Sequence, residues 1–395
     1  MTTNNHLADK KHIFSSVADR LTLMLILIIT ILRTIALAFS PLELGVDEAQ
    51  YWLWSQTLDF GYFTKPPLIA WIIGGSHWLF GHYTMAVRLP GCWLHLSTAV
   101  VLWQTAFWLY GPKAGRWTAL FWISLPSVGL GSFLISTDTP LLFCIAITLL
   151  AIAASESKKI PTAHAMLFAG FSLGLGMLAK YAALYGLFGL ILIWAIGRNW
   201  TAPVISGKHL LLAFSTFLIT LSPNLTWNFI NDFSAVRHLG ENANLAKSTN
   251  NLAESFTFLL SQAGVAGPLA FILMMGILGA AHRERHASWL ICMAIPVLII
   301  MILQAYLSEA NANWAMAAYP ALTVWLGGWI GCKHDVSSIF DKVRTWSGYG
   351  ALSINFILTL ALITITISGT LGPLTPDSDP LRRLRGWQDL ANDLE

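Results

Sequence analysis

Apolar runs long enough to cross a lipid bilayer recur along the whole of this 395-residue sequence. A helix needs about 20 apolar residues to cross roughly 30 Å of hydrocarbon. Hydrophobic residues make up 55% of the chain and charged residues only 11%, whereas a soluble domain carries about 25% charged residues. A soluble fold of this composition would lack the polar side chains that its surface needs. The sequence therefore predicts an all-α integral membrane protein.

About eleven runs have the length and apolar character of transmembrane helices. The first contains Arg33 and has no small-residue cleavage site, so it is expected to be a retained span rather than a signal peptide. The shorter runs are expected to bend around a cavity. The spans are predicted near 21–39, 91–110, 116–134, 139–154, 164–179, 182–197, 209–222, 257–280, 288–307, 313–331 and 349–371.

Loop charges predict how these spans are oriented. With the N-terminus inside, more than half of the 23 Lys and Arg residues fall in inner segments, and most of the 20 Asp and Glu residues fall on the outer side. Short loops rich in Lys and Arg remain on the cytoplasmic side. The N-terminus is therefore expected in the cytoplasm, and the C-terminus and the chemistry on the outer side.

The predicted organisation is one polytopic domain, 1–372, followed by a polar outer tail, 373–395. Its first large outer loop, 40–90, is acidic and aromatic, with helical stretches expected around 47–57 and 67–80. The second, 223–256, is rich in Asn and is expected to be loop-like. A net charge of +3, scattered along the chain, is too small for a nucleic-acid-binding protein.

Two adjacent acids, Asp47 and Glu48, follow the first span, with Tyr51 close behind them. Acids favour the first turn of a helix, so a solvated helix start is one interpretation. Neighbouring residues on a helix point about 100° apart, so the two carboxylates cannot both face one ligand. We expect one of them to be catalytic and the other to cap the helix or to form an ion pair.

Two cations lie shortly before spans. Lys65 precedes Pro66 and Pro67, and a residue before proline is disfavoured in a helix, so its ammonium group is presented from an extended segment. That arrangement suits binding of a phosphate at the membrane surface. Arg88 offers a second cation. A lysine that extends to the interface for its own solvation is the alternative.

Asp138 is an isolated acid between two apolar runs. Ionisable residues at such places are candidates for function, although Asp before Thr139-Pro140 also suits a helix N-cap. Lys180, between two later runs, is a further candidate for phosphate contact. The eleven His residues form no spaced ligand pair, and a divalent metal held by Asp and His on loops stays open. Weaker candidates for substrate contact are Tyr51, Tyr62, Arg237, His238, Glu309, Asn311 and Asn313.

In this order, the acid pair, Lys65-Pro66-Pro67, Arg88 and Asp138 resemble the GT-C superfamily of membrane glycosyltransferases. Within it they are most similar to the bacterial branch related to protein O-mannosyltransferases and to the lipid A aminoarabinose transferase. The resemblance extends along most of the chain, including the segments 238–244 (HLGENAN) and 379–387 (DPLRRLRGW).

The resemblance implies a GT-C-like bundle of about eleven transmembrane helices, with juxtamembrane helices in the first outer loop. It also implies transfer of a sugar from a polyprenyl-phosphate donor to an acceptor at the periplasmic side of the bacterial inner membrane. By motif position, Asp47 would be the catalytic carboxylate and Asp138 a second essential acid. Lys65 and Arg88 would contact the carrier phosphate. The expected acceptor is lipid A, lipopolysaccharide or another envelope glycolipid, with a protein as the alternative.

Two departures from the family pattern affect these expectations. The aminoarabinose transferase has an acid immediately before the matching lysine, whereas this chain has Thr64, so its sugar and any metal site are expected to differ. Relatives often continue past the Gly-Trp segment into a soluble portion, which predicts a short or truncated tail here. A transporter or flippase of lipid-linked sugars and a membrane scaffold are the rival interpretations. The flippase predicts charges buried within the spans, whereas most charges lie at span ends.

Overall fold

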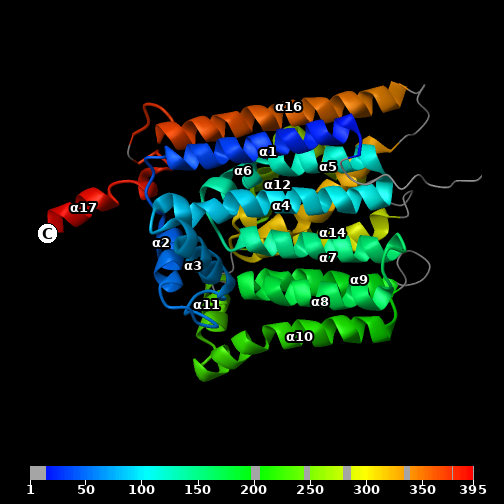
Figure 1. Cartoon of the computed structure of the whole chain (residues 1–395), viewed down its shortest axis with the longest axis horizontal. Helices are drawn as coiled ribbons and strands as arrows, with labels where there is room; N and C mark the ends of the chain where they lie inside the picture. The colour runs from blue at the N-terminus through cyan, green and yellow to red at the C-terminus, as the bar shows by residue number, and fades with distance from the viewer. Residues whose placement is uncertain are drawn as a thin grey trace, which may run out of the picture.

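The computed structural model describes residues 15–196, 205–243, 250–278, 286–332, 339–375 and 377–394, and the secondary structure in these ranges is helical. The long helices run side by side as a bundle (Figure 1). Of the helices in the described ranges, seven are long and apolar enough to cross a membrane. They are α1 (Val17–Ala38), α4 (Thr84–Tyr110), α7 (Asp138–Glu156), α8 (Thr162–Ala179), α10 (Gly207–Ile230), α14 (Ala287–Leu307) and α16 (Ile339–Ser368).

The expected number of about eleven transmembrane helices is not confirmed, because several predicted spans consist of shorter helices. The run 116–134 divides into α5 (Pro112–Ser124) and α6 (Pro126–Phe133), since a proline has no N–H to continue the helix and instead begins the next one. The run 182–197 contains α9 (Leu184–Ile196) after a 3₁₀ turn, and 313–331 contains a 3₁₀ helix, η5 (Ala312–Ala318), followed by α15 (Tyr319–Gly331).

The run 257–280 is bent rather than straight. α12 (Leu252–Ala266) and α13 (Pro268–Leu278) meet at 114° around Gly267, whose φ is +90°. Asn355 of α16 donates its side-chain amide to the Ala266 carbonyl at 2.9 Å, so the opened backbone has a partner. Gln262 donates to the Ala312 carbonyl at 3.1 Å. Irregular backbone at this depth is tolerated where protein groups satisfy it. The pair counts as an eighth span at most.

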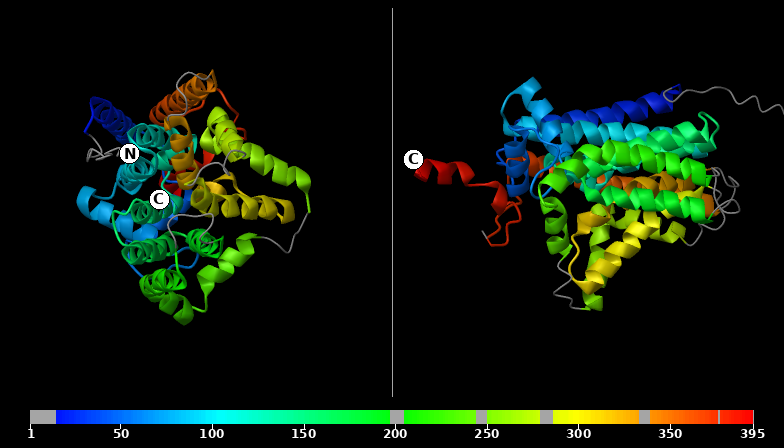
Figure 2. Two further views of the ribbon diagram at one scale, coloured as in Figure 1. Left: turned by 90° about the vertical axis from the view of Figure 1, so that its right-hand side faces the viewer. Right: turned by 90° about the horizontal axis from the view of Figure 1, so that it is seen from below.

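Short helices cover one end of the bundle, which we call the site end. The loop between α1 and α4 forms α2 (Val46–Ser55) and α3 (Leu68–Phe80), which confirms the two predicted helical stretches. Both lie across the ends of the long helices with α11 (Ser234–Ala243), and α17 (Trp387–Leu394) projects from the same end (Figures 1 and 2).

The prediction that 223–256 is loop-like is wrong for most of that segment. α10 continues to Ile230, α11 follows, and α12 begins at Leu252, while 244–249 lie outside the described residues. The polar side chains that suggested a loop are partners in the fold. Asn224 is buried and donates to the Phe60 carbonyl at 2.7 Å, and Asn228 donates to the Tyr181 hydroxyl at 3.1 Å. Buried amides with partners of this kind are compatible with a helix.

Candidate active site

A buried ion pair organises the site end. The Arg88 guanidinium binds both oxygens of the Glu48 carboxylate, Nε to Oε1 at 2.9 Å and Nη2 to Oε2 at 2.7 Å. It also donates to the Leu42 carbonyl at 3.0 Å and to the Glu43 carbonyl at 2.6 Å. Glu48 accepts from the Ile135 amide at 3.1 Å. A forked arginine–carboxylate pair is strong and specific in geometry, and this one joins the start of α2 to α4 and to the turn before α7.

These contacts give two of the predicted site residues a structural role. Arg88 is 1% exposed and Glu48 3%, and their polar groups are engaged with one another and with the backbone. This burial and pairing favour a structural role for both residues, so carrier-phosphate contact by Arg88 and catalysis by Glu48 stay predictions. Glu48 also accepts from the Gly45 amide at 3.0 Å, capping α2. Of the two adjacent acids, Glu48 is thus the one that caps the helix and forms the ion pair.

Asp47 has the opposite environment. It is exposed in the first turn of α2 and has no hydrogen bond or ion pair with any residue the structure describes. Tyr51, one turn further on, is buried. Burial, together with the negative charges of Asp47, Asp138 and Glu48, raises the pKa of the Tyr51 hydroxyl. Tyr51 therefore stays protonated, and its contact with substrate stays a prediction.

Asp138 begins α7 and forms another carboxylate–cation pair at the site end. Its Oδ1 accepts from Lys180 Nζ at 2.7 Å and its Oδ2 from Asn313 Nδ2 at 2.9 Å. The Lys180 side chain is 26% exposed, so this pair is open where the Glu48–Arg88 pair is closed. The predicted N-cap role is not observed, since Thr137 is the N-cap and both Asp138 oxygens bind side chains.

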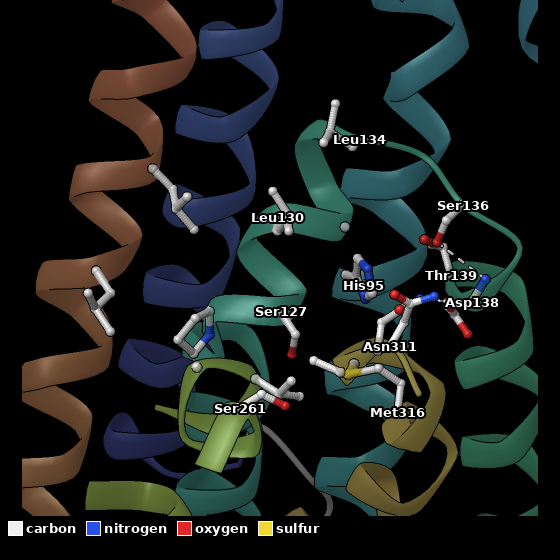
Figure 3. Close-up of a pocket in the computed structure, with 18 of the residues that line it drawn as sticks. His95, Ser127, Leu130, Leu134, Ser136, Asp138, Thr139, Ser261, Asn311 and Met316 are labelled. Atoms are coloured by element: carbon white, nitrogen blue, oxygen red, sulfur yellow. Dashed lines mark hydrogen bonds between the residues drawn. The ribbon is translucent and has the colours of Figure 1, made fainter. Parts of the chain in front are cut away.

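A cavity of about 900 Å³ extends from Asp138 into the bundle (Figure 3). Its walls come from α4, α6, α7, η5, α16 and the bend between α12 and α13, and most of them are apolar. Asn313 lines it beside Asp138. The open carboxylate–lysine pair therefore stands at the site end of a mainly hydrophobic chamber.

Lys65 lies in the loop between α2 and α3. It is half-buried, and its ammonium group has no hydrogen bond or ion pair within the described ranges. Tyr62 makes its hydrogen bonds within the same loop, and its contact with substrate stays a prediction. Its hydroxyl lies 3.0 Å from the Trp54 carbonyl and accepts from the Asp59 amide at 3.1 Å, and its ring stacks on Trp54 with 4.8 Å between centroids.

Three residues that the sequence did not single out clamp this loop. Trp227 donates its indole N–H to Asp59 at 2.8 Å, and Asn224 holds the Phe60 carbonyl. A Cβ on Gly61 would lie 2.3 Å from the Trp227 ring, so only glycine permits this approach. The ring of His238, on α11, lies 6.2 Å from that of Phe63 in the same loop.

No group of three or more His, Cys, Asp or Glu side chains within the described ranges is arranged to hold a metal ion.

The sequence profile of the dolichyl-phosphate-mannose-protein mannosyltransferase family matches residues 64–227. A lipid A galacturonosyltransferase from Rhizobium johnstonii is 37% identical over 321 residues, which are 78% of this chain and 66% of that protein. The undecaprenyl phosphate-α-4-amino-4-deoxy-L-arabinose arabinosyl transferase of Erwinia tasmaniensis is 25% identical over 67% of this chain and 52% of its own length. The crystal structure of ArnT from Cupriavidus metallidurans superposes with a TM-score of 0.68 at 18% identity, covering 93% of this chain and 68% of that one.

The chain belongs to the GT-C superfamily. It spans less than two thirds of the length of the curated relatives it matches. Lys65, Asp138 and Lys180 of this GT-C protein lie within the matched segment 64–227, together with the clamping residue Asn224, whereas Asp47 lies before it.

Proposed function

We propose that this GT-C protein transfers a sugar from a polyprenyl-phosphate donor to lipid A or a related envelope glycolipid, at the periplasmic side of the bacterial inner membrane. The observation that carries the proposal is the contrast between two neighbouring acids. Glu48 is locked to Arg88, while Asp47 remains exposed and unpaired within the described ranges, at the same end as the unpaired Lys65. The likeness to a lipid A galacturonosyltransferase supports lipid A as the acceptor and a uronic acid as the sugar class to test first.

Sugar transfer requires a carboxylate near the anomeric carbon and a cation near the carrier phosphate, because these two groups gain opposite charges. Glycosyl transfer breaks the bond between the anomeric carbon and the phosphate oxygen, and it passes through a state in which the sugar carries positive charge. Asp47 stabilises that charge or takes the proton of an acceptor hydroxyl. If the acceptor oxygen is a phosphate already ionised at neutral pH, Asp47 acts only through its charge.

The departing carrier phosphate gains negative charge as the glycosidic bond breaks. Lys65 is placed to bind it, because its ammonium group has no competing partner in the described part of the chain. Lys180 offers a second contact: an ammonium group has three N–H donors, and Asp138 accepts one of them. Both interactions strengthen as the charge develops, which is how binding lowers a barrier.

A protein acceptor is the second candidate, because the matching family profile is described as a protein mannosyltransferase. One experiment separates the two acceptors. Cells lacking the gene are complemented with the wild-type protein, with Asp47→Asn, or with Asp393→Asn, which changes an exposed acid on α17. Lipid A and total glycolipids are then profiled by mass spectrometry.

We expect a uronic acid increment on lipid A in cells with the wild-type protein or Asp393→Asn, and its loss in cells with Asp47→Asn. An unchanged lipid profile with a sugar increment on envelope proteins would replace the lipid acceptor by a protein. A normal lipid A increment with Asp47→Asn would remove Asp47 from the chemistry.

A further inference from the structure

The wall of the 900 Å³ cavity contains polar atoms without partners. Neither ring nitrogen of His95 and neither side-chain hydroxyl of Ser127 and Thr139 has a hydrogen bond within the described ranges, although all of these atoms are buried. His95 is 1% exposed. Buried polar groups almost always have partners, so these atoms mark places where another molecule completes the wall.

His95 and Ser127 lie close together. A Cβ on Gly131 would be 2.8 Å from His95 Nε2, so the imidazole rests against Gly131 of α6. Ser127 is four residues earlier on the same helix, and residues four apart share a helix face about 6 Å from one another. Figure 3 shows both side chains at the cavity. The pair is thus able to bind one polar group, or two that lie within a few bonds.

The pair lies below the site end. Ser127 precedes Leu134, at the end of α6, by seven residues, and His95 follows Arg88 by the same number along α4. At 1.5 Å per residue, this places both side chains about 10 Å inside the bundle. A ligand that fills the cavity therefore meets an apolar wall that is interrupted by hydrogen-bonding groups at this depth.

Two kinds of lipid chain are relevant to a glycosyltransferase of this type, and they differ in chemistry. An isoprenoid carrier is pure hydrocarbon below its phosphate, so it would leave His95 and Ser127 unpaired. An acyl chain with a hydroxyl or ester group near its carbonyl end has oxygens at a similar depth. Neutral imidazole offers one donor and one acceptor, and a serine hydroxyl offers both, so they are able to bind either oxygen function.

We propose that the cavity takes an acyl chain of the acceptor lipid and that His95 and Ser127 recognise a hydroxyl or ester oxygen on it. The inference rests on the proposed function and extends it: the cavity is the acceptor side of the site, and the carrier chain lies elsewhere. The enzyme therefore selects acceptors by the oxygenation of their acyl chains.

The test measures binding, so that it does not depend on transfer. Purified protein is mixed with equal amounts of a glucosamine disaccharide lipid carrying 3-hydroxyacyl chains and its synthetic 3-deoxy counterpart, and the bound species are compared by native mass spectrometry. Two hydrogen bonds predict roughly tenfold preference for the hydroxylated lipid. Ser127→Ala and His95→Phe should each reduce that preference, to about threefold or less.

Ser261→Ala is the matched control. Ser261 also lines the cavity, on α12, and its hydroxyl already donates to the Phe258 carbonyl at 2.6 Å. The control should keep the full preference, and binding of polyprenyl phosphate should be the same in all variants. A melting temperature close to that of the wild type shows that each variant is folded, and Ser127→Ala alone suffices if His95→Phe fails to fold.

Equal binding of the two lipids by the wild type would overturn the proposal. So would a loss of polyprenyl phosphate binding in Ser127→Ala, because it would place the carrier chain in the cavity. Failure of the proposed function has a different signature, in which the wild-type protein prefers the hydroxylated lipid but transfers no sugar to it.

Discussion

The Glu48–Arg88 and Asp138–Lys180 pairs both lie at the site end, and they differ in what surrounds them. Glu48 and Arg88 are sealed from solvent, and the carbonyls of Leu42 and Glu43 accept two further guanidinium N–H groups. Asp138 and Lys180 are partly open and stand beside the cavity. The buried Glu48–Arg88 pair thus stabilises the fold, whereas the partly exposed Asp138–Lys180 pair leaves ammonium donors for a ligand. Two changes test this contrast directly, and two more test segments that surround the pairs.

Arg88→Met should have the largest effect on stability. It leaves the Glu48 carboxylate buried without its partner, and breaking a buried pair in this way costs about 3–5 kcal/mol. Unfolding in an SDS titration measures the change, and Arg88→Met combined with Glu48→Gln should recover part of it. Unfolding of Arg88→Met at the wild-type midpoint would contradict the structural role of the closed pair.

Asp138→Asn should show the reverse pattern. Lys180 remains partly solvated, so the unfolding free energy should fall by no more than about 1 kcal/mol. The rate of sugar transfer should fall by about 100-fold or more, because Lys180 loses the carboxylate that holds it in place to contact the carrier phosphate. A large loss of stability with the rate preserved would make this pair structural as well.

Gly61→Ala tests the clamp that presents Lys65. The added methyl group would lie 2.3 Å from the Trp227 ring, so the loop must move. Overpacking of this kind costs about 1–3 kcal/mol, and we expect the KM for the donor to rise by about tenfold through displacement of Lys65. Gly75→Ala on α3 is the matched control, since nothing lies within 4 Å of its added Cβ. Equal donor KM values for the two variants would disconnect the loop from donor binding.

Glu43→Gln should have the smallest effect. The Glu43 carboxylate accepts from the Trp387 amide at 2.7 Å and from the Gln388 amide at 3.0 Å, at the start of α17. Loss of a charge at a helix N-terminus costs about 0.3–1 kcal/mol. Hydrogen exchange of the α17 amides should accelerate, while the unfolding midpoint and the transfer rate stay near those of the wild type. A large loss of transfer would connect α17 to the chemistry.

The sequence predicted the membrane class and the site end because it marks them by residue type. Acids and a lysine before proline stand out in a chain with 11% charged residues, and Asp47, Lys65 and Asp138 were found in this way. The role of Arg88 was not predictable, because it depends on carbonyls and an amide from segments that meet only in the folded bundle. A cation before a span has the same local sequence pattern whether its side chain is exposed to solvent or buried in an ion pair.

The number of spans and the extent of α10 were also set by tertiary contacts. Hydropathy does not register the bend at Gly267, which depends on Asn355 from a distant helix. The asparagines at the end of α10 indicated a loop because asparagine is common in turns. In the fold, Asn224 and Asn228 instead bind partners on neighbouring segments.

We propose that the two adjacent acids have separate roles, in which Asp47 acts in sugar transfer and Glu48 stabilises the fold. Purified wild-type protein, Asp47→Asn and Glu48→Gln should be compared for consumption of a polyprenyl-phosphate-linked uronic acid and for melting temperature in detergent. We expect Asp47→Asn to melt like the wild type and to lose transfer by about 100-fold or more. Glu48→Gln should melt several degrees lower. Full donor consumption by a normally folded Asp47→Asn protein would contradict the account.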